Sequence, residues 1–194
     1  MKKLLLTALL TMLCILCAPA QQPGTKPYKE PRVRFGAGYR YSLGVAEKYK
    51  ATYQSDSGTD KAVSPWGTPD NMRGGELRLE MTIRITPDWN VGAGWGMGMY
   101  DKDDWRSQLI YVKAERLYGK RPSRWFNYAE LGTTFYQHQG AGLTSSIGGG
   151  YRLAMTRRTR LDFTMGLEYL NIVSTDKTAR FNRFGVTVGL AMHF

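Results

Sequence analysis

The stretch from Glu76 to Thr86 reads ELRLEMTIRIT and alternates strictly between two kinds of side chain. Leucine, methionine and isoleucine occupy every second position, and glutamate, arginine and threonine occupy all the positions between them. Successive side chains of a β-strand point to opposite faces, so the stretch predicts a strand with one apolar and one charged face. The same alternation returns at the end of the chain, where the apolar positions are Phe184, Val186, Val188, Leu190, Met192 and Phe194.

Period-two alternation dominates from residue 32 onward, and no helical period competes with it. Tight turns separate some of the predicted strands and longer connections separate the others, the longest being residues 45–73. Short turns at one end and long loops at the other are typical of transmembrane barrels, whose short turns are periplasmic. We therefore predict an all-β fold, an eight-stranded antiparallel up-and-down transmembrane β-barrel over residues 32–194. The expected strands are 32–44, 74–86, 90–100, 105–118, 125–138, 143–155, 159–172 and 181–194.

Residues 1–20 carry the three parts of a secretory signal peptide, namely a short basic start, an apolar run and a small-residue cleavage site. We expect cleavage after Ala20. A lipoprotein anchor at Cys14 or Cys17 is the alternative, but a leucine precedes each cysteine where a small residue would be expected. The polar, proline-containing residues 21–31 are predicted to form a flexible periplasmic lead-in.

Cysteine content, net charge and mean hydropathy exclude some classes of function. Removing residues 1–20 removes both cysteines, so no disulfide or thiol chemistry is expected, and it lowers the formal charge of +11 by two. The remaining positive charge is spread along the chain, which gives no indication of nucleic-acid binding. The mean hydropathy is negative, as in a transmembrane barrel, where only alternate residues face lipid.

Alternation alone leaves open which face points inward. A lipocalin-like barrel would place the apolar column inside, around a ligand, and this is the alternative to a membrane barrel. Many of the 22 glycines fall in the polar column, where a narrow barrel uses them to make room for long neighbours. The polar column also carries charges of both signs in nearly equal number, as expected for charges that pair where little water reaches. The predicted lumen ion-pair network is Arg34, Arg40, Glu76, Arg78, Glu80, Arg84, Lys113, Glu115, Glu130, Arg152, Asp162, Glu168 and Arg183.

Aromatic residues gather near the ends of the predicted strands, which favours the outward orientation of the apolar face. Amphipathic rings collect where hydrocarbon meets lipid headgroups, so two girdles are expected. The girdle towards the loops contains Tyr41, Trp105, Phe135, Tyr169 and Phe184, and the girdle towards the turns contains Trp89, Tyr118, Trp125 and Phe194.

The last strand resembles the targeting signal of bacterial outer-membrane barrels, because Val188, Leu190 and Met192 alternate before Phe194. That resemblance implies recognition by the barrel-assembly machinery. Residues 32–194 as a whole resemble the small eight-stranded OmpA/OmpX-like barrels, of the kind abundant in Bacteroidetes-type genomes. The family implies location in the bacterial outer membrane, contact with its lipids and lipopolysaccharide, and a monomer; it says almost nothing about function.

The long connection 45–73 is the main functional candidate, because structureless loops of this length are usually functional or disordered. Its cationic and aromatic residues suit an extracellular protein or glycan, or lipopolysaccharide phosphates. We predict a structural or surface-interaction role, with a lumen plugged by paired charges. The candidate contact residues are Lys48, Tyr49, Lys50, Tyr53, Lys61 and Trp66.

Two other functions are compatible with the sequence. A narrow channel for small solutes is the first alternative, although side chains can fill an eight-stranded interior. The second is a rim hydrolase or lipid-modifying enzyme that pairs His138 with Asp101, Asp103 or Asp104. Against it, the omptin proteases have ten strands, and the HQG run at His138 lacks the His-x-Ser pattern of the lipid A deacylases. We expect no enzyme activity, no metal and no cofactor, since only His138 and His193 could supply imidazole ligands and the glycine run 92–98 lacks a P-loop lysine.

The predicted turns are rich in lysine and arginine, notably at Lys120-Arg121 and Arg157-Arg158. We interpret them as solvated turns. The alternative is contact with anionic phospholipid heads of the inner leaflet.

Overall fold

The computed structural model describes residues 31–55, 58–67, 73–100, 105–136, 140–156, 158–173 and 179–194. The predicted signal peptide and residues 21–30 of the predicted lead-in lie outside this part of the chain. Within it, no helix is long and apolar enough to cross a membrane.

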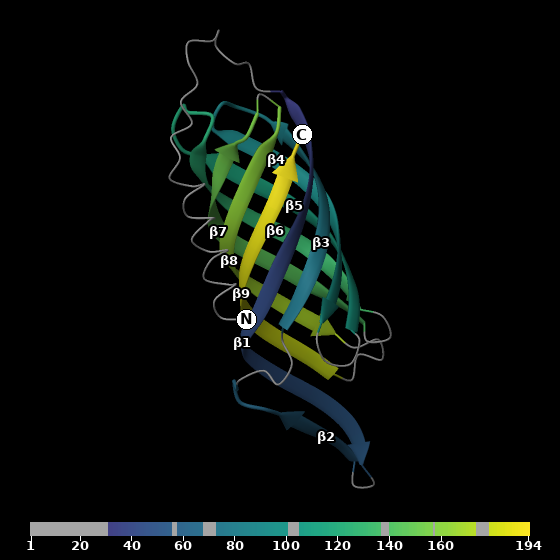
Figure 1. Ribbon diagram of the computed structural model, residues 1–194. Coiled ribbons are helices and arrows are strands. Elements are labelled where there is room, and N and C mark those ends of the chain that lie inside the picture. Colours follow the sequence, from purple (N-terminus) through teal and green to yellow (C-terminus); the bar gives the residue numbers. More distant parts are fainter. Residues whose placement is uncertain are drawn as a thin grey trace, which may run out of the picture. The chain divides into compact units, whose positions relative to one another are not determined.

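The described strands form one antiparallel sheet of nine strands, and all of them except β2 make up a closed eight-stranded barrel (Figure 1). Each barrel strand pairs with the next barrel strand along the chain, and the pairing of β1 with β9 closes the wall. The predicted up-and-down barrel is therefore confirmed. The barrel strands are β1 (Val33–Ser55), β3 (Arg73–Arg84), β4 (Trp89–Tyr100), β5 (Trp105–Leu117), β6 (Arg124–Tyr136), β7 (Gly140–Ala154), β8 (Arg160–Val173) and β9 (Ala179–His193).

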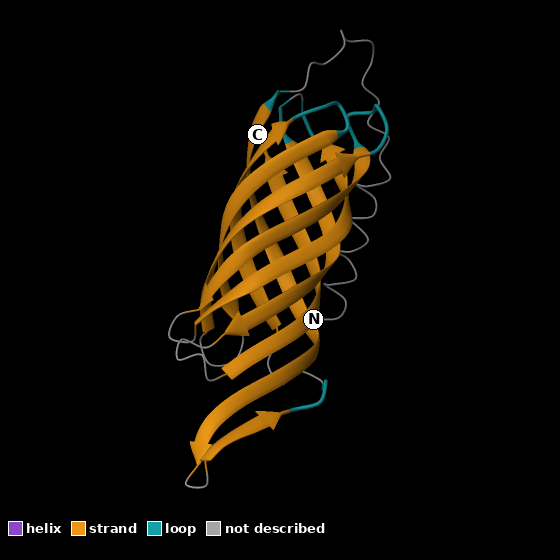
Figure 2. Cartoon of the chain, turned by 180° about the vertical axis from the view of Figure 1, so that it is seen from behind, coloured by secondary structure: helices purple, strands orange, loops and turns teal. Residues whose placement is uncertain are grey.

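Three tight turns and the last residue, Phe194, lie at one end of the barrel, which we call the turn end; the opposite end is the loop end (Figure 2). Two of these turns use the same local device. The hydroxyl of Thr86 accepts hydrogen bonds from the N–H groups of Asp88 and Trp89, at 3.3 and 3.1 Å. The hydroxyl of Thr156 accepts the equivalent bonds in the β7–β8 turn. Short turns of transmembrane barrels are periplasmic, so this end is expected to face the periplasm if the barrel spans a membrane.

Residues 45–63 are not the irregular loop that was predicted. β1 continues to Ser55, still paired with β9 as far as Ala51↔Ala179, and β2 (Gly58–Val63) pairs back onto it from Lys50↔Val63 to Ser55↔Gly58. The long connection is thus largely a β-hairpin that extends the barrel wall at the loop end. We call β1 from Lys50 together with β2 the hairpin.

A bulge at Val45 interrupts the pairing of β1 with β9. One extra residue exchanges the two faces of a strand. Before the bulge, Arg40 points into the barrel and is buried. After it, the odd-numbered residues take the inward positions, so that Glu47 lies 3.5 Å from Arg183.

The apolar column faces outward along the barrel wall. Ile147, at the middle of β7, is 62% exposed and Leu77 is 60% exposed, whereas the alternate charged residues are buried. The lipocalin-like alternative, with the apolar column inside, is therefore wrong. Several predicted girdle residues are also exposed near the strand ends: Tyr41, Phe135 and Phe184 at the loop end, and Trp89, Tyr118, Trp125 and Phe194 at the turn end.

Candidate functional site

Side chains from opposite sides of the barrel wall meet inside the lumen in an ion cluster around Glu130. Arg40 donates two hydrogen bonds to this carboxylate, at 2.6 and 2.8 Å, and Arg78 approaches it at 3.1 Å. Arg78 also lies 3.2 Å from Glu76. Arg40 comes from β1, Arg78 and Glu76 come from β3, and Glu130 comes from β6. The cluster therefore joins β6 to two strands with which it shares no backbone pairing. Such bidentate guanidinium–carboxylate pairs are strong and directional.

A second cluster surrounds Glu115, which is almost completely buried. Its carboxylate lies 3.0 Å from Lys113 and 3.0 Å from Arg152, and it accepts a hydrogen bond from the amide of Asn90. Arg152 in turn contacts Asp162 at 2.6 Å. Two carboxylates and two cations thus neutralise one another, which offsets the large cost of burying each charge alone.

Glu80 connects the second cluster to the last strand. Lys113 contacts it at 2.7 Å, and the hydroxyl of Tyr111 donates a hydrogen bond to it at 3.0 Å. The Nε2 atom of His193 lies 3.2 Å from both Glu80 and Asp162. Sequence reasoning did not include His193 in the lumen network, although its position in the polar column of the last strand placed it inside.

Aromatic rings and glycines complete the lumen. The guanidinium carbon of Arg78 lies 3.9 Å from the centre of the Tyr111 ring, and Arg152 lies 5.1 Å from Phe126. A methyl group at Gly94 would come within 2.4 Å of the Tyr111 ring. The glycine therefore makes room for a long neighbour, as the sequence predicted.

The remaining members of the predicted network lie near the two ends of the clusters. Arg34 is buried and Arg84 is half-buried towards the turn end. Glu168 is buried and interacts electrostatically with Arg40 and Arg183. A cavity of about 30 Å³ remains among the charged side chains of both clusters, which is room for one or two water molecules.

Above the ion clusters, at the loop end, an apolar cluster lies in the lumen beside the Glu47–Arg183 pair. Tyr136, Leu170 and Ile172 are buried together and Phe181 packs against them. The ring of Tyr49 lies 4.8 Å from that of Phe181. We call these five residues the loop-end cap. Sequence reasoning missed the cap and placed Tyr49 in an outer contact surface, because the bulge at Val45, which turns Tyr49 inward, has no signal in the alternation.

The other predicted contact residues are divided between two places. The ring of Trp66 lies 5.4 Å from that of Phe184, so Trp66 packs beside a residue of the predicted girdle at the loop end. Lys48 is half-buried and Lys50 is exposed on the extension of β1. Tyr53 and Lys61 lie in the hairpin, where Tyr53 pairs with Asp60 and Lys61 pairs with Thr52. The structure describes the backbone of these two residues but not their side chains.

Backbone hydrogen bonds fix the base of the hairpin. Glu47 and Gly67 exchange two of them, at 2.9 and 3.0 Å, and Ser64 bonds to Tyr49 with both its N–H and its hydroxyl. Among the described strands, β2 pairs only with β1, so its other edge is unpaired.

The predicted targeting residues lie on the outer face of the last strand and beyond its end. All four are exposed, namely Val188, Leu190, Met192 and Phe194. The N–H of Phe194 donates to the carbonyl of Phe35 on β1, at 2.8 Å. Recognition of these four residues by the barrel-assembly machinery stays a prediction.

The candidate rim residues Asp101, Asp103, Asp104 and His138 lie outside the described residues. In the described part of the chain, no group of three or more histidine, cysteine, aspartate or glutamate residues could hold a metal ion.

The barrel resembles solved structures of outer-membrane proteins. OprG from Pseudomonas aeruginosa is 8% identical over 85% of this chain and 97% of that chain, with a TM-score of 0.50. Neisserial surface protein A is 16% identical over 78% and 95%, with a TM-score of 0.47. The attachment invasion locus protein Ail of Yersinia pestis is 12% identical over 84% and 99%, with a TM-score of 0.33. No protein-family model and no curated protein sequence matches the chain.

This is the fold of an outer-membrane β-barrel. An exposed apolar wall around buried, paired charges is what a barrel needs in lipid, where every backbone polar group must be satisfied within the closed sheet. The chain is accordingly a transmembrane barrel of the bacterial outer membrane, and its outer wall contacts the membrane lipids. At sequence identities of 8–16%, the similarity to these proteins extends to the fold and not to the function.

Proposed function

We propose that this outer-membrane barrel is a closed scaffold whose hairpin is a contact surface for an extracellular protein. The observation that carries the proposal is the extension of the barrel wall into a hairpin whose outer strand, β2, has an unpaired edge among the described strands. The lumen supports the first half of the proposal and the hairpin supports the second.

The lumen has two obstructions in series. The ion cluster around Glu130 links β6 to β1 and β3 across the interior, and the cluster around Glu115 links β5 to β7. The loop-end cap adds packed apolar side chains above them. The cavity among the charged side chains, about 30 Å³, has room for one or two water molecules, which supports a closed lumen. A structural barrel is therefore favoured over a narrow channel.

The hairpin suits protein recognition through its main chain. An unpaired strand edge presents a row of N–H and C=O groups that can add a strand from a partner. The bonds between Glu47 and Gly67 and between Ser64 and Tyr49 hold the hairpin in position, which lowers the entropy cost of binding. Lys48 and Lys50 could instead attract lipopolysaccharide phosphates, and the experiment below separates the two partners.

Replacing residues 52–61 with Asn-Gly tests the role of the hairpin. The replacement keeps the pairs Lys50↔Val63 and Ala51↔Ala62 and closes them with a two-residue turn that favours a hairpin. The barrel should keep its thermal stability, because its closing strand pairs remain. Adhesion of expressing cells to immobilised host matrix proteins or to neighbouring cells should be lost.

A Lys48→Ala/Lys50→Ala variant is the matched control. If the main-chain edge of β2 carries recognition, this variant should adhere like the wild type. Loss of adhesion in the lysine variant alone would show that charge carries the contact, as expected for a phosphate-bearing partner such as lipopolysaccharide, and would refute recognition through the β2 edge. Equal adhesion of the wild type and the shortened barrel would leave only the structural role.

A further inference from the structure

The side chain of Arg116 lies on the outer face of the barrel wall at the turn end. Most other charged side chains of the barrel strands there point into the lumen. Arg116 occupies an outward position of β5 and is exposed. Its guanidinium lies 5.9 Å from the ring centre of Trp89 and 5.5 Å from that of Tyr118. Two rings of the turn-end girdle therefore flank this guanidinium. We propose that Arg116 binds the headgroup phosphate of an anionic phospholipid in the inner leaflet.

The position of Arg116 matches the depth of a phosphate. Trp89 begins β4 and pairs with Arg116, and Tyr118 follows the end of β5. Tryptophan and tyrosine rings of a girdle sit at the level of the lipid headgroups. A guanidinium stacked on such rings keeps its N–H edge free, and that edge matches the geometry of a phosphate.

Hydrogen-bond donors accompany the guanidinium. Asn127 pairs with Arg116 across β5 and β6, and its amide donates to the hydroxyl of Tyr118 at 3.1 Å. The Tyr118 hydroxyl accepts that bond, so its own proton is available for a phosphate oxygen. The next outward position, on β7, is Gly149, where a methyl group would meet the Asn127 oxygen at 3.2 Å. A glycine on an outward strand face leaves room for close approach of a ligand.

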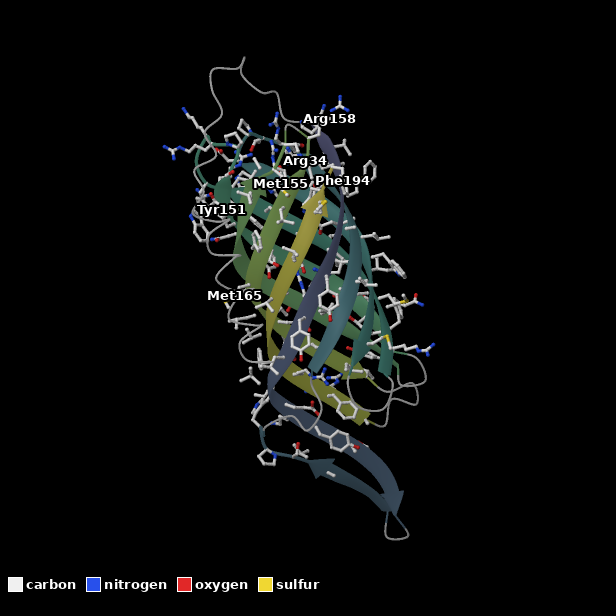
Figure 3. All side chains as sticks on the ribbon, viewed as in Figure 1. Arg34, Tyr151, Met155, Arg158, Met165 and Phe194 are labelled. Atoms are coloured by element: carbon white, nitrogen blue, oxygen red, sulfur yellow. The ribbon has the colours of Figure 1, made fainter. Side chains whose placement is uncertain are left out.

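The charge around the site favours an anionic lipid. Lys120, Arg121 and Arg158 are exposed on the neighbouring turns, and Figure 3 shows Arg158 at the same end as Arg34, Met155 and Phe194. Few carboxylates oppose this positive charge. Among the described residues of the turn end, Asp88 has an exposed side-chain carboxylate, whereas those of Glu115 and Asp162 are buried in the lumen. Positive potential near a bilayer surface attracts acidic lipids.

The refolded protein in nanodiscs of phosphatidylcholine with dilute phosphatidylglycerol provides the test. Native mass spectrometry of the released barrel measures how much phosphatidylglycerol each variant retains. Arg116→Gln removes the charge and the N–H fork, so the apparent affinity for phosphatidylglycerol should fall about tenfold. Arg116→Lys keeps the charge but loses the planar stack, and an intermediate loss is expected.

Arg106→Gln is the matched control. Arg106 is exposed on the same strand and the same face, at the loop end, and both ends meet phospholipid heads in a symmetrical nanodisc. Its retention should stay close to that of the wild type, and an excess of inorganic phosphate should displace no lipid. Unchanged retention in Arg116→Gln, an equal loss in Arg106→Gln, or displacement by inorganic phosphate would each overturn the proposal. Circular dichroism of every variant verifies that the barrel is folded.

Discussion

Glu130→Ala is expected to destabilise the refolded barrel by about 3–5 kcal/mol, because removal of one partner leaves buried cations without their counter-charge. Glu130 is the carboxylate between Arg40 and Arg78, and the side chains of both arginines are less than a tenth exposed. After the substitution Arg78 retains Glu76, whereas Arg40 loses both of its shortest hydrogen bonds. Urea unfolding in detergent or lipid vesicles measures the change.

Two further variants separate charge from packing. The double variant Glu130→Met/Arg40→Met removes both charges while keeping apolar volume, and it should recover much of the lost stability. Asp88→Asn changes an exposed carboxylate in a turn and should stay within about 0.5 kcal/mol of the wild type. If Glu130→Ala were as stable as Asp88→Asn, the ion cluster would contribute nothing to the fold.

Ile147→Arg is the second substitution with a large expected effect. Ile147 lies at the middle of β7, points outward and is 62% exposed. An arginine that faces lipid at the bilayer midplane destabilises a barrel by about 2–4 kcal/mol. On a barrel in water, the same change at so exposed a position would cost almost nothing. Urea unfolding of the barrel in lipid vesicles gives the value.

Met155→Arg is the control for depth. Met155 lies in the same outward column, directly after the end of β7, and it is 54% exposed. Near the interface the cost of an arginine falls to about 0–1 kcal/mol. Equal effects of Ile147→Arg and Met155→Arg would contradict the lipid-facing assignment of this column.

The fold could be predicted from the sequence because lipid and lumen impose opposite demands on alternate residues. The pattern in residues 76–86 is long and strict, so a register shift of one residue would place Arg78 and Glu80 in lipid. The charges in the polar column indicated the interior for the same reason. Their partners could not be predicted, because Arg40 and Glu130 meet across the lumen and not across a strand pair.

The extension of the wall could not be predicted in the same way. Val45 is an extra residue in β1 and forms a bulge. A bulge exchanges the inward and outward faces of the strand, so even-numbered residues face the lumen before it and odd-numbered residues after it. The two segments therefore do not form one continuous alternating pattern in the sequence. The polar residues of the hairpin resemble a loop in composition, although the turn-forming residues 55–58, SDSG, separate two segments that pair with one another. The loop-end cap was missed because Tyr49 lies inside only after this shift.

Single-channel conductance of the purified wild-type barrel in a planar lipid bilayer tests the central claim, the closed lumen, most directly. The clusters around Glu130 and Glu115 and the loop-end cap predict no steady conductance steps above those of the protein-free bilayer. The replacement of residues 52–61 by Asn-Gly should remain equally silent, because it leaves both obstructions in place. Large, steady steps from the wild-type barrel would contradict the account and identify the protein as a channel.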